Sequence, residues 1–225
     1  MPEAPNAVRE LASDPTSRKK FLRQAGGTGV AASLAVFVAA CGSDDSSSSK
    51  KSSTPASTPM ATSGTEQFGK GDLGIANYAL TLEYLETEFY AKAAESGMLK
   101  GRILELAKGF GADEQAHVDA LIALIKKAGG KPAAKPMAKF PLDSERAILR
   151  LAATVENLGA GAYLGQAGNI QDKEILAAAL SIHSIEARHA AVLNLATKAP
   201  VTSGAFAKPA TAAEVLMSVK PFLVT

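Results

Sequence analysis

A short pattern of glutamate and histidine occurs twice in this 225-residue chain. Glu114 precedes His117 by three residues, and Glu186 precedes His189 by the same interval. Residues three apart lie on the same face of an α-helix, so each pair can reach one common ligand side by side. If the two pairs bind such a ligand together, the chain must fold so that both helix faces turn towards the same interior.

The repetition extends beyond these pairs. Residues 79–85 read ALTLEYL and residues 152–158 read AATVENL, and both contain A-x-T-[LV]-E-x-L. This match aligns Glu83 with Glu156. Each half of the helical part therefore contributes two glutamates and one histidine, which indicates a repeated helix pair.

Apolar residues at three- and four-residue steps predict helices in this part of the chain. Four long helices are expected at about residues 71–97, 99–127, 144–168 and 173–198. A short last helix should begin at Thr211, with Glu214 completing a capping box. The segment 130–143 contains three prolines and cannot be a regular helix. The sequence thus predicts an all-α four-helix bundle with one long crossover between helices two and three.

Single glutamates on helices one and three, with Glu-x-x-His on helices two and four, form the ligand pattern of di-metal carboxylate bundles. On these residues the sequence resembles the ferritin-like superfamily, most closely its exported ferritin-like domain proteins, over about residues 70–220. The resemblance implies that the glutamates of the two Glu-x-x-His motifs bridge two metal ions. The other two glutamates would be terminal ligands, and each metal would have one histidine. The expected ligands are Glu83, Glu114, His117, Glu156, Glu186 and His189.

Four carboxylates would neutralise two divalent cations inside a core where an unpaired charge is very costly. Oxygen and imidazole ligands suit iron or manganese. One function is then redox chemistry with dioxygen, peroxide or ferrous iron, of a ferroxidase, peroxidase or catalase kind. The alternative is a non-enzymatic envelope protein of the stress or desiccation type. Whether the chain is an enzyme stays open, as does the choice of metal.

Several nearby residues leave alternatives open. Tyr90 and Tyr163 each follow a predicted ligand by seven residues. They could pack in the core, donate hydrogen bonds to the ligands or be redox-active. His183, one turn before Glu186, could support a ligand or be an ordinary buried or boundary histidine.

Glu86 lies one turn after Glu83 and keeps the apolar spacing of its helix. In the repeat, however, Glu86 aligns with Gly159, which has no side chain. We therefore expect Glu83 to be the ligand and Glu86 to lie in solvent. Gly159, with Gly161 and Gly165, could admit a bulky neighbour or open a path for a substrate.

The first 65 residues predict export and attachment. Residues 17–23 read SRKKFLR, and an apolar stretch to Ala40 follows, which is the layout of a signal peptide over residues 1–40. SRKKFL resembles the twin-arginine export motif, with Lys19 in place of the second arginine, so the export route stays open. The residues before Cys41 resemble a lipobox, which implies that Cys41 carries a lipid; an ordinary cleaved signal is the alternative.

Residues 41–65 are rich in Ser, Thr and Pro and predict a disordered tether, followed by the bundle at 66–225. We expect a membrane lipoprotein or a periplasmic, extracytoplasmic protein. A homo-oligomer is compatible with this, whereas a closed cage is not expected because each subunit would carry a lipid. The expected substrate is a small oxidant or a metal ion.

Charge and cysteine content exclude some functions. Five of the 24 basic and three of the 22 acidic residues precede Cys41, so the rest of the chain is neutral and no basic patch predicts a nucleic-acid partner. With one cysteine, the chain has neither an internal disulfide nor a four-cysteine iron site.

Overall fold

The computed structural model describes residues 64–224. The predicted signal peptide, Cys41 and the predicted tether up to residue 63 lie outside the described residues. Thr65, placed at the end of the predicted tether, is buried. Within residues 64–224, no helix is long and apolar enough to cross a membrane.

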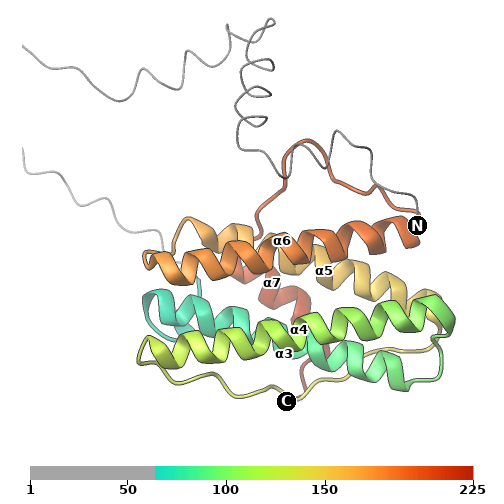
Figure 1. Ribbon diagram of the computed structural model, residues 1–225, viewed down its shortest axis with the longest axis horizontal. Helices are drawn as coiled ribbons and strands as arrows, with labels where there is room; N and C mark the ends of the chain where they lie inside the picture. The colour runs from blue at the N-terminus through green and yellow to red at the C-terminus, as the bar shows by residue number, and fades with distance from the viewer. Residues whose placement is uncertain (1–63, 225) are drawn as a thin grey trace, which may run out of the picture. The chain divides into compact units, whose positions relative to one another are not determined.

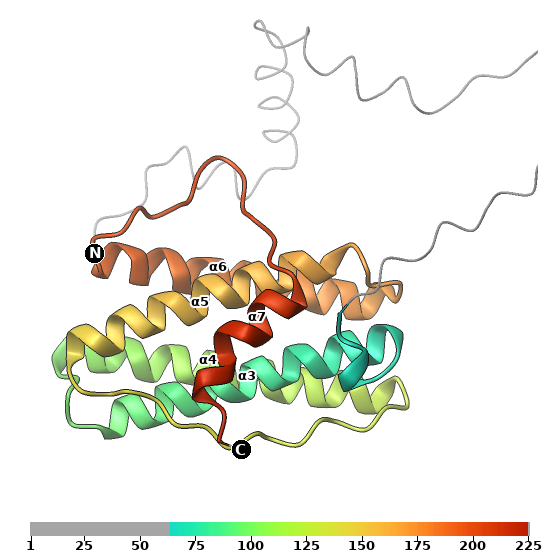
Figure 2. The ribbon, with the colours of Figure 1, turned by 180° about the vertical axis from the view of Figure 1, so that it is seen from behind.

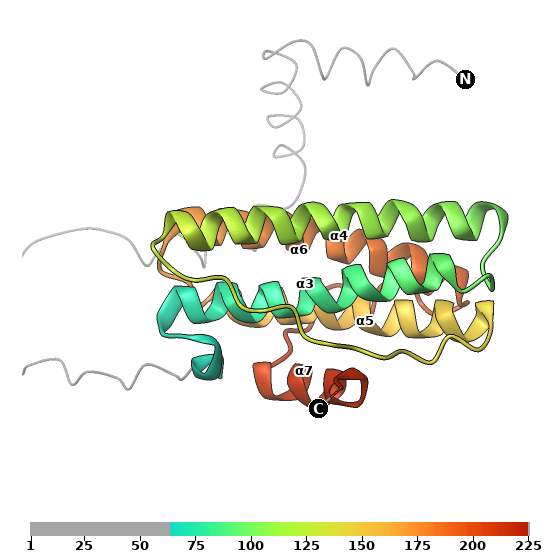
Figure 3. The same ribbon diagram turned by 90° about the horizontal axis from the view of Figure 1, so that it is seen from below.

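Four long helices form the bundle in the described part of the chain. They are α3 (Gly71–Glu95), α4 (Gly101–Lys127), α5 (Glu145–Ala167) and α6 (Lys173–Ala196). Helices α3 and α4 form one hairpin, and α5 and α6 form the other (Figure 1). The segment between α4 and α5 runs along the bundle to join the two hairpins (Figure 3). The predicted all-α bundle with one long crossover is confirmed.

Shorter helices flank the bundle. They are η1 (Glu66–Phe68), α7 (Ala212–Val219) and η2 (Lys220–Phe222). Thr211 and Glu214 form the predicted capping box at the start of α7, each side chain accepting from the other residue's backbone N–H. Helix α5 is capped by Ser144, whose side chain accepts from the Ala147 N–H. The helices begin and end within a few residues of the predicted positions because these local signals are present in the sequence.

The C-terminal segment lies across α3 and α5, on the side of the bundle away from α4 and α6 (Figures 2 and 3). Two backbone hydrogen bonds hold it to the crossover: Lys139 N–H donates to Phe222 O at 2.8 Å, and Val224 N–H donates to Met137 O at 3.0 Å. Val215 of α7 is fully buried. Helix α7 therefore covers the seam between the two hairpins.

Two glycines of α5 allow the segment that precedes α7 to pack closely against α5. Ala210 N–H donates to Gly161 O at 2.9 Å, which places the backbone before α7 directly on α5. A Cβ atom at Gly165 would lie 2.0 Å from Ala210 O. For Gly161 and Gly165, the structure thus supports accommodation of a neighbouring segment rather than a path for a substrate.

This contact predicts opposite effects for two glycine-to-alanine changes. Gly165→Ala should destabilise the protein by about 1–3 kcal/mol, because the new methyl group displaces the segment at Ala210. Gly109, in the middle of α4, has no heavy atom within 4 Å of its added Cβ. Gly109→Ala should therefore stabilise the protein by up to about 1 kcal/mol through helix propensity alone. Urea unfolding measures both, and equal stabilisation by the two changes would contradict the described contact.

Candidate metal centre

The four helices bring the six predicted ligands together in the interior. Their order is Glu83 on α3, Glu114 and His117 on α4, Glu156 on α5, and Glu186 and His189 on α6. All four glutamates are completely buried, and His189 is 4% exposed. Four buried carboxylates side by side are costly unless positive charge accompanies them.

The six side chains form two overlapping groups, in each of which the nearest ligand atoms lie within 4.8 Å of one another. The first group is Glu83, Glu114, His117 and Glu186, and the second is Glu114, Glu156, Glu186 and His189. Glu114 and Glu186 belong to both. Two neighbouring metal positions that share two carboxylates would have this composition, as the resemblance implies.

Several buried atoms of this cluster have no hydrogen-bond partner within residues 64–224. They are Glu114 Oε1, Glu156 Oε2, both carboxylate oxygens of Glu186, and His189 Nδ1. His189 Nδ1 nevertheless lies 2.9 Å from Glu114 Oε1 and 3.4 Å from Glu156 Oε2. The atoms are close but do not point along N–H···O lines, although buried polar atoms are normally paired. Unpaired carboxylate oxygens that converge in this way are suited to bind metal ions, so the donor set fits them.

The charges of the cluster support the same fit. The ion pairs of these carboxylates within the described residues involve only His117 and His189. Burial, followed by repulsion from Glu114, raises the pKa of Glu83 to about 7. Burial and the charge of Glu83 raise the pKa of Glu186 well above its ordinary value. Since no lysine or arginine of residues 64–224 forms an ion pair with these carboxylates, protons or metal ions must neutralise the cluster.

The pKa values of both histidines are raised, although burial alone would lower them. Burial favours neutral imidazole, but contacts with Glu114, Glu186 and Glu83 raise the pKa of His117 to about 12. Glu114 and Glu156 likewise raise the pKa of His189 to about 10. The neighbouring carboxylates thus favour the protonated form of both histidines.

The two repeated tyrosines contact the cluster. Tyr163 O–H donates to Glu83 Oε1 at 2.6 Å, and Tyr90 O–H donates to Glu156 Oε1. Both side chains are also buried in the apolar core. Each tyrosine thus packs in the core and holds a glutamate of the other helix pair, the one expected to be a terminal ligand.

His189 has two supports that the sequence did not reveal. Its Nε2 lies 3.2 Å from Asp113 Oδ2, and its ring stacks on Phe110 with centroids 3.8 Å apart. A carboxylate on the outer nitrogen fixes the orientation of a metal-binding imidazole. Asp113 aligns with Ile185 in the repeat, so the comparison of the two halves gave no signal for it.

His183 has a different surrounding. Its Nδ1 lies 3.0 Å from Ala160 O, so this nitrogen donates to the backbone carbonyl and links α6 to α5. His183 is in neither ligand group. Of the two alternatives for His183, the structure supports a histidine bonded at the boundary of the core.

The expectation that Glu86 lies in solvent is wrong. Glu86 is 5% exposed, and burial together with the charges of Glu186 and Glu83 raises its pKa well above the ordinary value. A Cβ atom at Gly159 would lie 3.0 Å from Glu86 Oε1 and 2.9 Å from Glu186 Oε2. Gly159 therefore provides the room for Glu86 beside the cluster. The pairing of a glutamate with a glycine at equivalent repeat positions was the available signal.

The fold and the cluster define a ferritin-like four-helix bundle whose carboxylates and histidines fit a di-metal centre. The model of the ferritin-like domain family matches residues 71–199, more than half of the chain. The chain therefore belongs to this family.

Two solved structures resemble the chain. A conserved hypothetical protein from Mycobacterium tuberculosis is 19% identical with a TM-score of 0.52, and the match covers 60% of this chain and 96% of that one. Ferritin-like, diiron-carboxylate proteins from Bacillus anthracis strain Ames are 23% identical with a TM-score of 0.49, covering 61% and 99%. The first likeness supports the fold. No curated protein sequence matches the chain.

The raised pKa values predict that the metal-free protein loses stability as the pH rises. Below its unfolded pKa, Glu83 is protonated in both states; as the pH rises towards about 7, the folded state keeps a proton that the unfolded state has released. His189 adds the same slope between its unfolded pKa and about 10. The free energy of unfolding should fall by roughly 2–3 kcal/mol between about pH 5 and 7. Thermal unfolding with a chelator measures this slope.

Bound metal should reverse that slope, because metal ions bind the deprotonated ligands.

Glu86→Gln should raise the stability of the metal-free protein at about pH 8, since it removes a buried, repelled carboxylate. Glu88→Gln is the matched control: Glu88 pairs with Lys92 at 2.6 Å and with Lys135 at 3.3 Å, and both lysines lower its pKa. A metal-free protein that becomes more stable from pH 5 to 8 would contradict the described electrostatics.

Proposed function

We propose that this chain is a di-metal carboxylate protein that holds two iron or manganese ions and carries out redox chemistry with dioxygen, peroxide or ferrous iron. The observation that carries the proposal is the pair of overlapping ligand groups, in which four buried carboxylate oxygens have no hydrogen-bond partner among the described residues. Iron and manganese accept this mixture of carboxylate and imidazole ligands. Two ions that each change oxidation state by one supply the electron pair that reduces dioxygen or peroxide.

The chain's own residues would prepare the centre in four ways. Glu114 and Glu186, which belong to both ligand groups, would hold both ions, so the pair would stay together when its charge changes. Tyr90 and Tyr163 keep the terminal glutamates in position through their O–H groups. Asp113 orients the imidazole of His189. The burial of all four glutamates keeps bulk water from the ligand atoms.

The place of action that we propose is the cell envelope. The signal-like segment before Cys41, and Cys41 as a lipid attachment point, are the basis for this proposal. A tether between Cys41 and the buried Thr65 would let the bundle work at the membrane surface without inserting a helix.

The first test is metal content. Protein purified from its native host, or reconstituted without oxygen, should hold about two metal ions per chain. Glu83→Ala and Glu156→Ala should lose metal to a similar extent, because the repeat and the ligand groups place these residues equivalently. His183→Ala should keep its metal, since His183 contacts a backbone carbonyl instead of the cluster. Elemental analysis and titration with ferrous or manganous ions measure the binding.

Activity distinguishes the two functions left open by the sequence. Metal-loaded protein should oxidise ferrous iron with dioxygen, or consume peroxide, and Glu186→Ala should abolish this. Trace metal after careful reconstitution, or two tightly bound ions without any reaction, would favour the non-enzymatic envelope protein.

The location has its own test. The full-length protein should fractionate with membranes, and Cys41→Ala should release it or stop its maturation. If the full-length protein fractionates with membranes through its lipid, mass spectrometry of the N-terminus should show that lipid on Cys41. A native protein that still begins at Met1 in the cytosol would refute the envelope proposal.

A further inference from the structure

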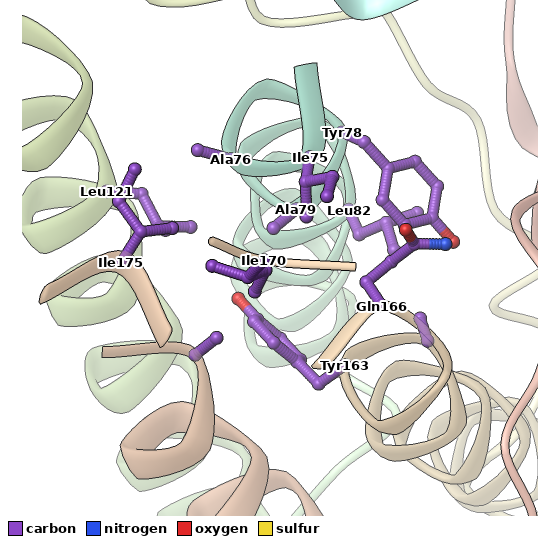
Figure 4. Close-up of a pocket in the computed structure, with 12 residues that line it drawn as sticks. Ile75, Ala76, Tyr78, Ala79, Leu82, Leu121, Tyr163, Gln166, Ile170 and Ile175 are labelled. Atoms are coloured by element: carbon purple, nitrogen blue, oxygen red, sulfur yellow. The ribbon is translucent and has the colours of Figure 1, made fainter. Parts of the chain in front are cut away.

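Three small cavities lie beside the carboxylate cluster in the described part of the chain, and two of them are related by the repeat. The Tyr163 cavity, of about 20 Å³, is shown in Figure 4. The Tyr90 cavity is about 10 Å³. Ile75, Ala79 and Leu121 around the first correspond to Ile148, Ala152 and Leu193 around the second.

These two cavities follow from how one helix pair packs on the other. The Tyr163 cavity is the larger one, because it is lined by Ala76 at the position where the larger Leu149 lines the Tyr90 cavity. Each cavity is lined by residues of both helix pairs, and the repeat relates one cavity to the other. Neither cavity therefore lies on the axis that relates the two halves.

The third cavity, which we call the α7 cavity, has a different position. It measures about 20 Å³ and lies between α3, α5, the crossover and the C-terminal segment. It is lined by three pairs of equivalent residues: Leu82 with Val155, Leu85 with Leu158, and Glu86 with Gly159. A cavity lined by both members of each pair lies on the pseudo-twofold axis of the bundle. The shared ligands Glu114 and Glu186 are also an equivalent pair, so this axis leads to the midpoint between the two expected metal positions.

The inner wall of the α7 cavity adjoins the cluster directly. The point where a Gly159 Cβ would lie is within 3.0 Å of both Glu86 Oε1 and Glu186 Oε2. Glu86 is the single charged residue of the wall, and the other lining residues that the structure describes are apolar apart from Gly159. Val215 and Val219 of α7 form the roof, with Phe222 and Phe140 beside them.

We propose that the α7 cavity is a binding site for one small apolar molecule, dioxygen, on the axis that leads to both metal positions. The proposal rests on the proposed function and adds to it a place where the oxidant is held before it reaches the metals. Holding one water-sized molecule takes roughly 10–15 Å³, so the volume suits a diatomic molecule.

The chemistry of the wall selects an apolar occupant. Apolar cavities remain dry and bind apolar atoms such as xenon. Peroxide would lose its hydrogen bonds to water and find one carboxylate in return, which is unfavourable. The α4–α6 side is better suited to the approach of peroxide or metal ions, because the His117 side chain there is 11% exposed and that of Asp113 is 57% exposed.

The test combines xenon binding with oxygen kinetics. Crystals of the protein under xenon pressure should show a xenon atom bounded by Leu85, Phe89 and Val215. Val215→Leu adds one methylene group to the roof, at a residue outside both ligand groups, and should remove that xenon. Ala76→Leu is the matched control: it fills the Tyr163 cavity with the residue that the other half carries, and xenon should stay in the α7 cavity. Thermal unfolding verifies that both variants are folded.

The same variants then separate the oxidants. In iron-loaded protein, Val215→Leu should slow ferrous oxidation by dioxygen severalfold and leave the reaction with peroxide unchanged, whereas Ala76→Leu should change neither. Absence of xenon from the α7 cavity, or loss of xenon with unchanged dependence on dioxygen, overturns the inference. A chain that holds no metal contradicts the proposed function whatever xenon does; a metal-loaded chain whose cavity takes no xenon contradicts only this inference.

Discussion

The mutual repulsion of buried carboxylates is the constraint on which the rest of this structure depends. Glu83, Glu114, Glu156 and Glu186 have no contact with solvent, and the cluster has no lysine or arginine partner among the described residues. Such a group is tolerable only if protons or metal ions stand between the oxygens. The surrounding structure holds the ligands in place against this repulsion, through two tyrosine O–H groups and an aspartate behind one histidine.

The bundle reaches this arrangement by placing one helix pair against its own repeat. Equivalent residues then meet near one axis, which explains why two glutamates belong to both ligand groups. Two of the differences between the halves lie beside the cluster. Glu86 occupies the room that Gly159 leaves, and Asp113 supports His189 where Ile185 stands in the other half. The two expected metal positions would therefore differ in charge and in ligand orientation, although their expected ligands repeat.

The C-terminal segment gives one side of this centre a different character from the other. Helix α7 and the crossover close the α3–α5 side with apolar side chains, whereas the α4–α6 side carries Asp113 and the partly exposed His117. Gly161 and Gly165 make that closure possible, because a larger residue at Gly165 would collide with the backbone at Ala210. An apolar and a polar approach to one cluster follow from this packing.

The sequence by itself determined the helices, the crossover and the six residues that converge. These features rest on local signals, such as helix periodicity and capping, and on a repeat that aligns Glu83 with Glu156. Burial of Glu86, the role of Asp113 and the cavity under α7 were decided by the tertiary structure. Each of them depends on a neighbour from another helix: Gly159 makes room for Glu86, His189 meets Asp113, and α7 covers the seam between α3 and α5. The spacing along one helix states which face a side chain occupies, but the residue that faces it is set only when the helices pack.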